Sequence, residues 1–252
     1  MMKPNLKMLP TRSEKPRKMG MTMVMDKGLS IRQAEDLIEV GGDLVDFVKL
    51  GFGTSLFTST VKEKIALYRA ANIRVYVGGT LFEAFYHRNQ LDEFRGWVDY
   101  LGCDAIEISD GCIEMAHAEK CEQIRKFSGS HYVLSEVGCK DASVEIPVEE
   151  WVSMTLNELS AGSSVVIAEA RESGTVGIYD CDGQANSLLI EALMAAAGQD
   201  QIMWEAPAKS QQAWFVNLLG ANVNLGNIAP DEVIALETLR TGLRGDTFHR
   251  FI

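Results

Sequence analysis

The feature that most constrains the fold is a regular alternation of short apolar runs and longer amphipathic stretches along the chain. The runs have the length of strands, the stretches have helical periodicity, and the connections between them are short. Eight runs are expected to be strands: residues 21–25, 45–50, 73–77, 105–108, 132–137, 164–168, 202–204 and 222–225. Amphipathic helices are expected at residues 31–40, 61–71, 90–101, 114–127, 148–161, 185–197, 210–219 and 230–239. This order is typical of an α/β protein with parallel strands.

Eight strands, with helices between and after them, close naturally into a (β/α)8 TIM barrel. The usual barrel length of about 250 residues fits the 252 residues of this chain. A doubly wound open sheet is the competitor, but it usually has fewer strands and a glycine-rich phosphate turn after the first. Here the first strand meets Asp26-Lys27-Gly28, and no GxGxxG follows. We therefore expect one barrel domain over residues 19–252, preceded by a basic arm over residues 1–18.

Charge and cysteine content narrow the classes of function. The net charge of −11 argues against nucleic-acid binding. The basic start of the chain has no apolar segment of the kind found in secretory signals, and no run approaches the length of a membrane span. Five cysteines, with no CxxC pair, indicate reduced thiols and a cytoplasmic protein. The arm is expected to pack across the barrel's N-terminal end, to contact a neighbour in a homo-oligomer, or to be disordered.

Four of the apolar runs stop at a glutamate, at spacings of 29, 33 and 36 residues. These glutamates are Glu107, Glu136, Glu169 and Glu205. On neighbouring parallel strands they would converge at the carboxyl ends, where barrel active sites form. Crowded carboxylates repel one another, so a metal ion, a proton or bound cationic groups must compensate. Carboxylate oxygens suit Mg²⁺, although a lone glutamate at a strand end is more often a surface or ion-pairing residue.

Basic residues and glycine-rich turns occupy other strand ends. Lys49 ends the second strand, Lys140 follows the fifth, and Lys209 lies four residues after Glu205. A lysine in such a site can act as an acid, a base or an electrostatic clamp. The turns at residues 51–55 and 78–80 offer backbone N–H groups to an anion, although tight-turn geometry alone would also explain them.

Eight ordered motifs resemble the phosphosulfolactate synthase family over about residues 15–248. They are KPR (15–17), VKLGFGTS (48–55), GGTLFE (78–83), IEISDG (106–111), EVGCK (136–140), EARESG (169–174), EAPAKSQQ (205–212) and NVNLGNI (222–228). The resemblance implies a barrel enzyme that uses Mg²⁺ to add sulfite to phosphoenolpyruvate in coenzyme M biosynthesis. The product would be (2R)-2-O-phospho-3-sulfolactate.

With this chemistry, Glu107, Glu136 and Glu169 are expected to hold the metal, and Lys140 to donate the proton. The reverse arrangement, with Lys49 as the acid and Lys140 as an anion clamp, stays open. The remaining residues expected at the substrate are Arg171, Gly79, Thr80, Asn224, Lys209 and Glu205. Arg171 and Lys49 would neutralise sulfite, phosphate or substrate carboxylate, and Glu205 would orient Lys209 or lie behind the metal ligands.

Two other functions remain compatible with the sequence. One is a different barrel enzyme that uses Mg²⁺ and an enolate on another phosphorylated acid. The other is a non-catalytic or stress-related paralogue on the same barrel, because a plant heat-stress-associated branch shares the family's motifs. The acids and lysines argue against the paralogue, since a chain without catalytic selection has no reason to keep a costly carboxylate cluster.

Overall fold

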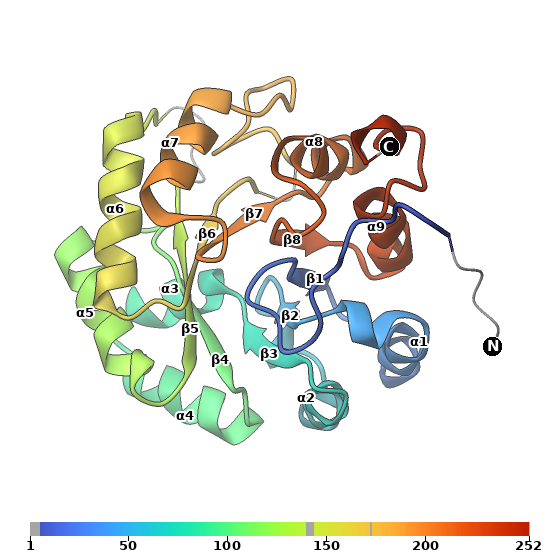
Figure 1. Ribbon diagram of the computed structural model, residues 1–252. Coiled ribbons are helices and arrows are strands. Elements are labelled where there is room, and N and C mark those ends of the chain that lie inside the picture. Colours follow the sequence, from blue (N-terminus) through green and yellow to red (C-terminus); the bar gives the residue numbers. More distant parts are fainter. Residues whose placement is uncertain (1–5, 140–143, 172, 252) are drawn as a thin grey trace.

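The computed structural model describes residues 6–139, 144–171 and 173–251, and eight parallel strands lie in these segments. They are β1 (Thr22–Asp26), β2 (Phe47–Leu50), β3 (Arg74–Val77), β4 (Ala105–Ile108), β5 (Tyr132–Val137), β6 (Val165–Ala168), β7 (Ile202–Glu205) and β8 (Leu225–Ile228). Hydrogen bonds join them in the order β3-β2-β1-β8-β7-β6-β5-β4. Because β3 and β4 pack side by side, the sheet forms a nearly closed ring (Figure 1). The predicted (β/α)8 barrel is confirmed.

Helices surround this ring on its outer side (Figure 1). They are α1 (Ile31–Gly41), α2 (Val61–Ala70), α3 (Gly79–Tyr86), α4 (Leu91–Leu101), α5 (His117–Ser128), α6 (Val148–Ala161), α7 (Ser187–Ala197), α8 (Lys209–Leu219) and α9 (Val233–Arg240). Short 3₁₀ turns are η1 (Gly42–Leu44), η2 (Thr54–Leu56), η3 (Pro230–Glu232) and η4 (Phe248–Arg250). Within the described segments, none of the helices is both long and apolar enough to cross a bilayer.

Two local expectations were wrong, and one buried lysine was not expected. Helix α3 was missed because its glycine-rich first turn was interpreted only as a turn. Strand β8 begins at Leu225, because Asn222 and Asn224 use their side chains to bond neighbouring backbone at the strand's entry. The charge-rich stretch 114–126 has the composition of a solvated helix face, yet Lys120 within it is only 1% exposed.

Alternation along the strands divides the core into two layers. In β2, Phe47 points into the barrel, whereas Val48 and Leu50 pack beneath the helices. Inside the barrel, Phe47 meets Tyr76 of β3 edge-on, with 6.4 Å between ring centroids. Each such side chain contributes about 1.5–3 kcal/mol when fully buried. The interior layer therefore forms an apolar floor, above which the polar strand ends lie.

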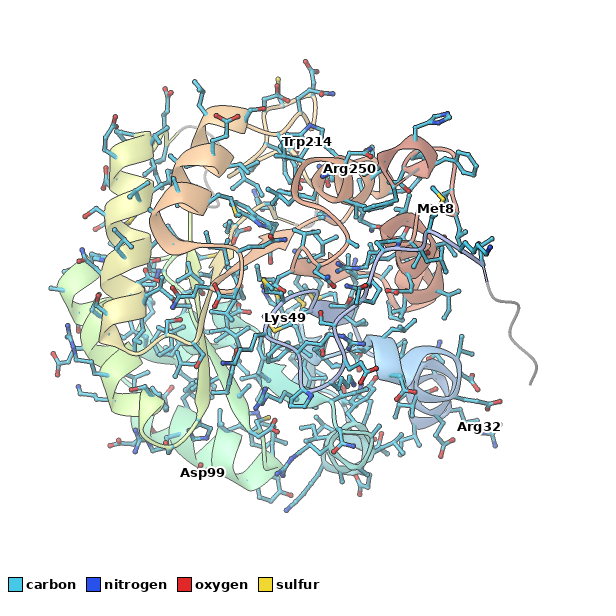
Figure 2. The ribbon with its side chains drawn as sticks, in the orientation of Figure 1. Met8, Arg32, Lys49, Asp99, Trp214 and Arg250 are labelled. Carbon is cyan, nitrogen blue, oxygen red and sulfur yellow. The ribbon has the colours of Figure 1, made fainter. Side chains whose placement is uncertain are left out.

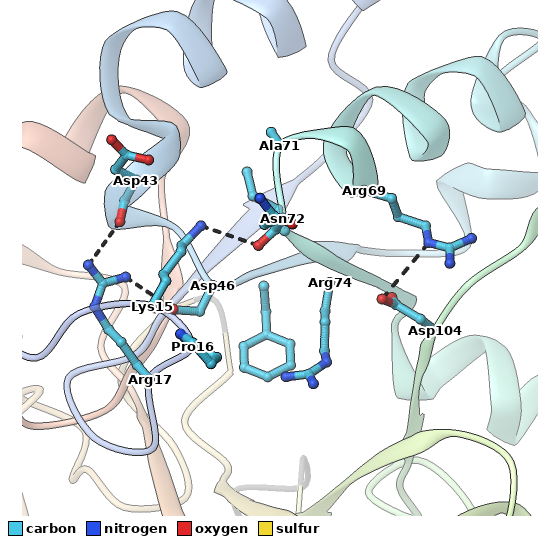
Figure 3. A pocket seen from close by; sticks show the side chains of 12 residues that line it. Lys15, Pro16, Arg17, Asp43, Asp46, Arg69, Ala71, Asn72, Arg74 and Asp104 are labelled. Carbon is cyan, nitrogen blue, oxygen red and sulfur yellow. Dashed lines mark hydrogen bonds and ion pairs between the residues drawn. The ribbon is translucent and has the colours of Figure 1, made fainter.

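The N-terminal arm lies across the N-terminal end of the barrel. Arg12 donates from Nε to Glu237 at 2.9 Å and from Nη1 to the Ala221 carbonyl at 2.8 Å. Arg17 donates to Asp46 at 3.1 Å, and Lys15 donates to the Gly42 carbonyl at 2.8 Å. Lys15, Arg17 and Asp46 border a cavity of about 620 Å³ (Figure 3). That cavity opens at the starts of the strands, so it lies opposite the end where the glutamates converge.

Candidate active site

All four strand-end glutamates are buried at the carboxyl end of the barrel. Glu107, Glu136 and Glu205 lie on β4, β5 and β7, and Glu169 follows β6 directly. None is more than 2% exposed. The predicted convergence is therefore present in the structure, and the polar ends project over the apolar floor.

Lys49 of β2 lies at the centre of this cluster. Its Nζ is 2.9 Å from Glu107 Oε2, 3.4 Å from Glu136 Oε2 and 3.5 Å from Glu205 Oε1. Figure 2 shows Lys49 within the ring of strands, while Arg32 and Asp99 lie at the periphery. Burial by itself would lower the pKa of Lys49, but the carboxylates of Glu107, Glu136 and Glu205 together raise it well above its usual value. Lys49 is thus a permanent cation in this site.

Three of the glutamates have the arrangement of a metal site. Glu136, Glu169 and Glu205 each place a carboxylate oxygen within 4.8 Å of the others. The group shares two members with the expected trio, but Glu205 stands where Glu107 was expected. Buried oxygen donors at this separation are chemically suited to Mg²⁺, which prefers carboxylates and needs a compact site. The donor set therefore fits the cofactor that the sequence suggested.

Glu107 is occupied by a different contact. Its Oε1 accepts a hydrogen bond from the backbone N–H of Gly79 at 2.5 Å, at the start of α3. Its Oε2 faces Lys49, so one carboxylate connects the helix N-terminus with the buried ammonium. Negative charge at a helix N-terminus is favourable because the first N–H groups there have no intrahelical partner. Glu107 thereby fixes the position of both Lys49 and the first turn of α3.

A cavity of about 570 Å³ opens directly over these groups. Its lining includes Lys49, Glu136, Glu169 and Glu205, together with Gly79, Thr80 and Arg171. Apart from glycines, five lining residues were not among the expected site residues: Met25, Phe52, Cys112, Ser173 and Asn227. Phe52, Ser173 and Asn227 lie within the quoted family motifs, so a closer reading of those motifs would have found them. Cys112 carries no sequence signal, since it lies one residue beyond the IEISDG motif.

The arrangement concentrates negative charge in a buried space. Among the described residues, the four glutamates outnumber the single ammonium at their centre. Arg171 adds a second cation at the cavity wall. The site can therefore accept a metal ion at the glutamates and an anionic substrate between that ion, Lys49 and Arg171.

Other expected site residues lie elsewhere. Lys140 falls outside the described residues. Asn224 precedes β8 at the N-terminal end, where it accepts from the Met21 N–H at 2.9 Å and donates to the Ile202 carbonyl at 3.1 Å. It therefore lies at the wrong end of the barrel to touch a substrate in this cavity. Lys209 pairs with Asp246 at 2.7 Å on the surface, and its side chain is 44% exposed, so Glu205 meets Lys49 instead.

Comparisons with known proteins agree with the motifs. The family model described as (2R)-phospho-3-sulfolactate synthase (ComA) matches residues 10–246. A phosphosulfolactate synthase of Methanothermobacter thermautotrophicus is 45% identical over 244 residues, which cover 94% of this chain and 95% of that protein. The phosphosulfolactate synthase of Bacillus subtilis is 41% identical over 243 residues, covering 95% and 96%. A solved 3-hexulose-6-phosphate synthase from Salmonella typhimurium shares the fold, with a TM-score of 0.52, 14% identity and coverage of 91% and 97%.

Proposed function

Because the chain is an enzyme of the (2R)-phospho-3-sulfolactate synthase family, we propose that it adds sulfite to phosphoenolpyruvate. The product is (2R)-2-O-phospho-3-sulfolactate. The observation that carries the proposal is the buried cluster of Glu136, Glu169 and Glu205 around Lys49, at the floor of a cavity that suits a small anion. The proposal includes the cytoplasmic location and the link to coenzyme M biosynthesis that the sequence suggested.

The cofactor we propose is Mg²⁺, held by Glu136, Glu169 and Glu205. When bound, it supplies a Lewis acid that stabilises the negative charge developing on the substrate's carboxylate. Lys49 keeps the glutamates together before the substrate arrives, because its ammonium lies within 3.5 Å of Glu136 and Glu205. The site is thus organised in advance, which is how a fixed electrostatic environment accelerates a reaction.

The substrate's anionic groups have separate partners in the cavity. We assign the phosphate to the wall formed by Gly79 and Thr80 at the start of α3. Thr80 is the proposed donor there, because the Gly79 N–H already bonds Glu107. Arg171 lies at the same cavity and is assigned to sulfite. Its positive φ of 47° places the residue in the left-handed region, directly after the Glu169 strand end. A guanidinium at this point counters the charge of the incoming nucleophile.

The proposed reaction forms a carbon–sulfur bond at the methylene carbon and a carbon–hydrogen bond at C2. The sulfur lone pair of sulfite forms a bond to the methylene carbon, and the π electrons of the double bond move toward C2 and the carboxylate. A proton must reach C2, and we assign its delivery to Lys140, which follows β5 in the sequence. Lys49 is assigned to organising the glutamates instead, because its ammonium lies 2.9 Å from Glu107 Oε2 and within 3.5 Å of Glu136 and Glu205.

Direct assay of the purified chain tests the proposal. Phosphoenolpyruvate, sulfite and Mg²⁺ are incubated with the protein, and phosphorus NMR is used to follow the conversion. We expect a new organophosphorus signal that needs all three components, disappears with EDTA and returns with excess Mg²⁺. Loss of phosphoenolpyruvate without sulfite would indicate a different reaction of the enolate. Absence of any product from folded protein would overturn the proposal.

A further inference from the structure

Lys120 of α5 lies behind the glutamate cluster and is almost completely buried. Its Nζ donates to the Glu136 carbonyl at 2.6 Å and to Asp110 Oδ1 at 2.8 Å. The same nitrogen lies 2.8 Å from Glu158 Oε1. An ammonium has three N–H donors, so these three oxygens can occupy all of them. The side chain is 1% exposed, so water does not compete for these donors.

The three oxygens come from three different parts of the barrel. Asp110 belongs to the loop that follows β4, Glu136 ends β5 on the site side, and Glu158 lies on α6. A single side chain therefore joins the ends of two neighbouring strands to the helices outside them. The β4 loop also carries Cys112, which lines the active-site cavity.

The contact with Glu136 is made through the backbone, whereas the carboxylate of the same residue faces the cavity. Glu136 lies in register with Ile167 of β6, two residues before Glu169. Fixing the Glu136 carbonyl fixes the peptide plane from which its side chain leaves. The Cα of Glu136 lies in that plane, so the contact also limits the directions in which the carboxylate can approach Glu169 and Glu205.

The charges around Lys120 explain why a lysine can occupy this dry position. Burial by itself would lower the pKa of Lys120, but Glu158 and Asp110 outweigh burial and raise it. Burial raises the pKa of Glu158, and the ammonium of Lys120 opposes that rise. His117 also faces Glu158, with Nδ1 3.8 Å from Oε1, and burial lowers the pKa of its imidazole. Lys120 is accordingly the permanent cation of this second cluster.

We propose that Lys120 is a positioning residue, which sets the metal affinity of the active site by holding the Glu136 backbone. The inference rests on the proposed function in one respect, since it takes Glu136 as a ligand of the metal. Lys120 is not among the residues that line the cavity, so it is not placed to touch the substrate. Its effect is therefore on the geometry of the glutamates and not on the bonds that change.

Replacement of the ammonium by an apolar chain of similar length tests the proposal. Mn²⁺ serves as the probe, and its binding is followed by electron paramagnetic resonance without substrate. For Lys120→Met we expect Mn²⁺ affinity and kcat to fall by about 10- to 100-fold, as for other residues that orient metal ligands. The KM for phosphoenolpyruvate should change little, since Lys120 does not touch it. The matched control is Lys126→Met on the same helix, where the side chain is 51% exposed and pairs with Glu122.

Lys120→Met leaves Glu158 buried without its cation, and this alone would lower the stability of the protein. A second variant therefore separates the effect on metal binding from the effect on stability. In the double variant Lys120→Met/Glu158→Gln that buried charge is absent. We expect it to melt closer to the wild-type temperature than Lys120→Met does, yet to bind Mn²⁺ as weakly as the single variant. Wild-type Mn²⁺ affinity and kcat in the folded double variant would overturn the proposal.

The two proposals fail in different ways. A wild-type chain that binds Mn²⁺ but forms no sulfonate product refutes the proposed function, and the binding comparison still tests Lys120. A wild-type chain that binds no Mn²⁺ refutes the role of Lys120 as well.

Discussion

Among single residues, Lys49 has the strongest influence on the site. Three glutamates lie within 3.5 Å of its ammonium, in a space that the apolar interior closes from below. Removing one partner of a buried ionic group leaves uncompensated charge, which costs far more than an exposed ion pair contributes. The lysine thus makes it possible to keep these carboxylates ionised and close together in the absence of metal.

Lys49→Met should therefore destabilise the protein by about 3–5 kcal/mol at pH 8. The pKa of Lys49 is raised above its usual 10.5, so its own stabilising contribution is complete below that pH and is lost only as pH rises past the folded-state value. Urea unfolding of both proteins at pH 5 and 8 measures the difference, with Lys126→Met as the exposed control. A loss no larger than that of Lys126→Met at either pH would contradict this account.

Among the elements, α3 shapes the wall of the cavity. Its first turn approaches β4 so closely that Gly79 has no room for a side chain. A Cβ at this position would lie 2.6 Å from Glu107 Oε1 and would also collide with Ser109 Oγ. The φ of Gly79 lies outside the left-handed region, so the backbone conformation does not require glycine. The close approach to β4 does.

Gly79→Ala should cost about 1–3 kcal/mol of stability through overpacking. It should also lower kcat, because the displaced Glu107 no longer holds Lys49 in place. The control is Gly96→Ala in the middle of α4, where a Cβ meets nothing within 4 Å. That change should stabilise the protein by about 0.8–1 kcal/mol through helix propensity alone. Thermal melts and steady-state rates of both variants check this, and an active, stable Gly79→Ala enzyme would refute it.

For the molecule as a whole, the two ends of the barrel have separate tasks. The carboxyl end holds the glutamates and the cavity, whereas the amino end holds the arm and its ion pairs. Arg12 alone contacts Glu237, Asn222 and two backbone carbonyls, and it thereby joins the arm to β8 and α9. Stability and catalysis should consequently respond to different substitutions.

Arg12→Ala should lower the free energy of unfolding by about 1.5–3 kcal/mol, the usual range for hydrogen bonds to charged groups. The kcat of the folded fraction should stay at the wild-type value, because these contacts lie at the opposite end of the barrel. Urea unfolding and rates at a temperature where both proteins are folded provide the measurements. Lys7→Ala, at an exposed position of the same arm, should change neither. A reduced kcat in folded Arg12→Ala would show that the ends are coupled.

The sequence predicted the barrel and the converging glutamates because both follow from periodicity. A run of alternating residues that ends in glutamate places its carboxylate at a strand's carboxyl end whatever the helices do. It could not say which glutamates share a metal, since that depends on side-chain directions set by Lys49 and Gly79. Asn224 shows the same limit, because a three-residue error in the start of β8 moved it to the wrong end.

Lys120 and Asp26 show what periodicity cannot distinguish. Lys120 lies in a stretch whose composition is that of a solvated surface, and only the packing of α5 against α6 reveals that it is buried. Asp26 ends β1 as the glutamates end their strands, yet it turns outward to pair with Lys64 at 2.7 Å and Tyr68 at 3.2 Å. Whether such a side chain is buried, and whether it points into the barrel or out toward the helices, depends on the neighbouring elements.

The position of the arm also has a practical consequence. Residues 10–17 lie at the starts of the strands, so a partner protein or solid support joined ahead of the arm would face away from the cavity. Substrate could then diffuse freely to an immobilised enzyme. The arm is therefore the natural attachment point for an immobilised enzyme, because a tether there leaves the rim of the cavity open to solvent.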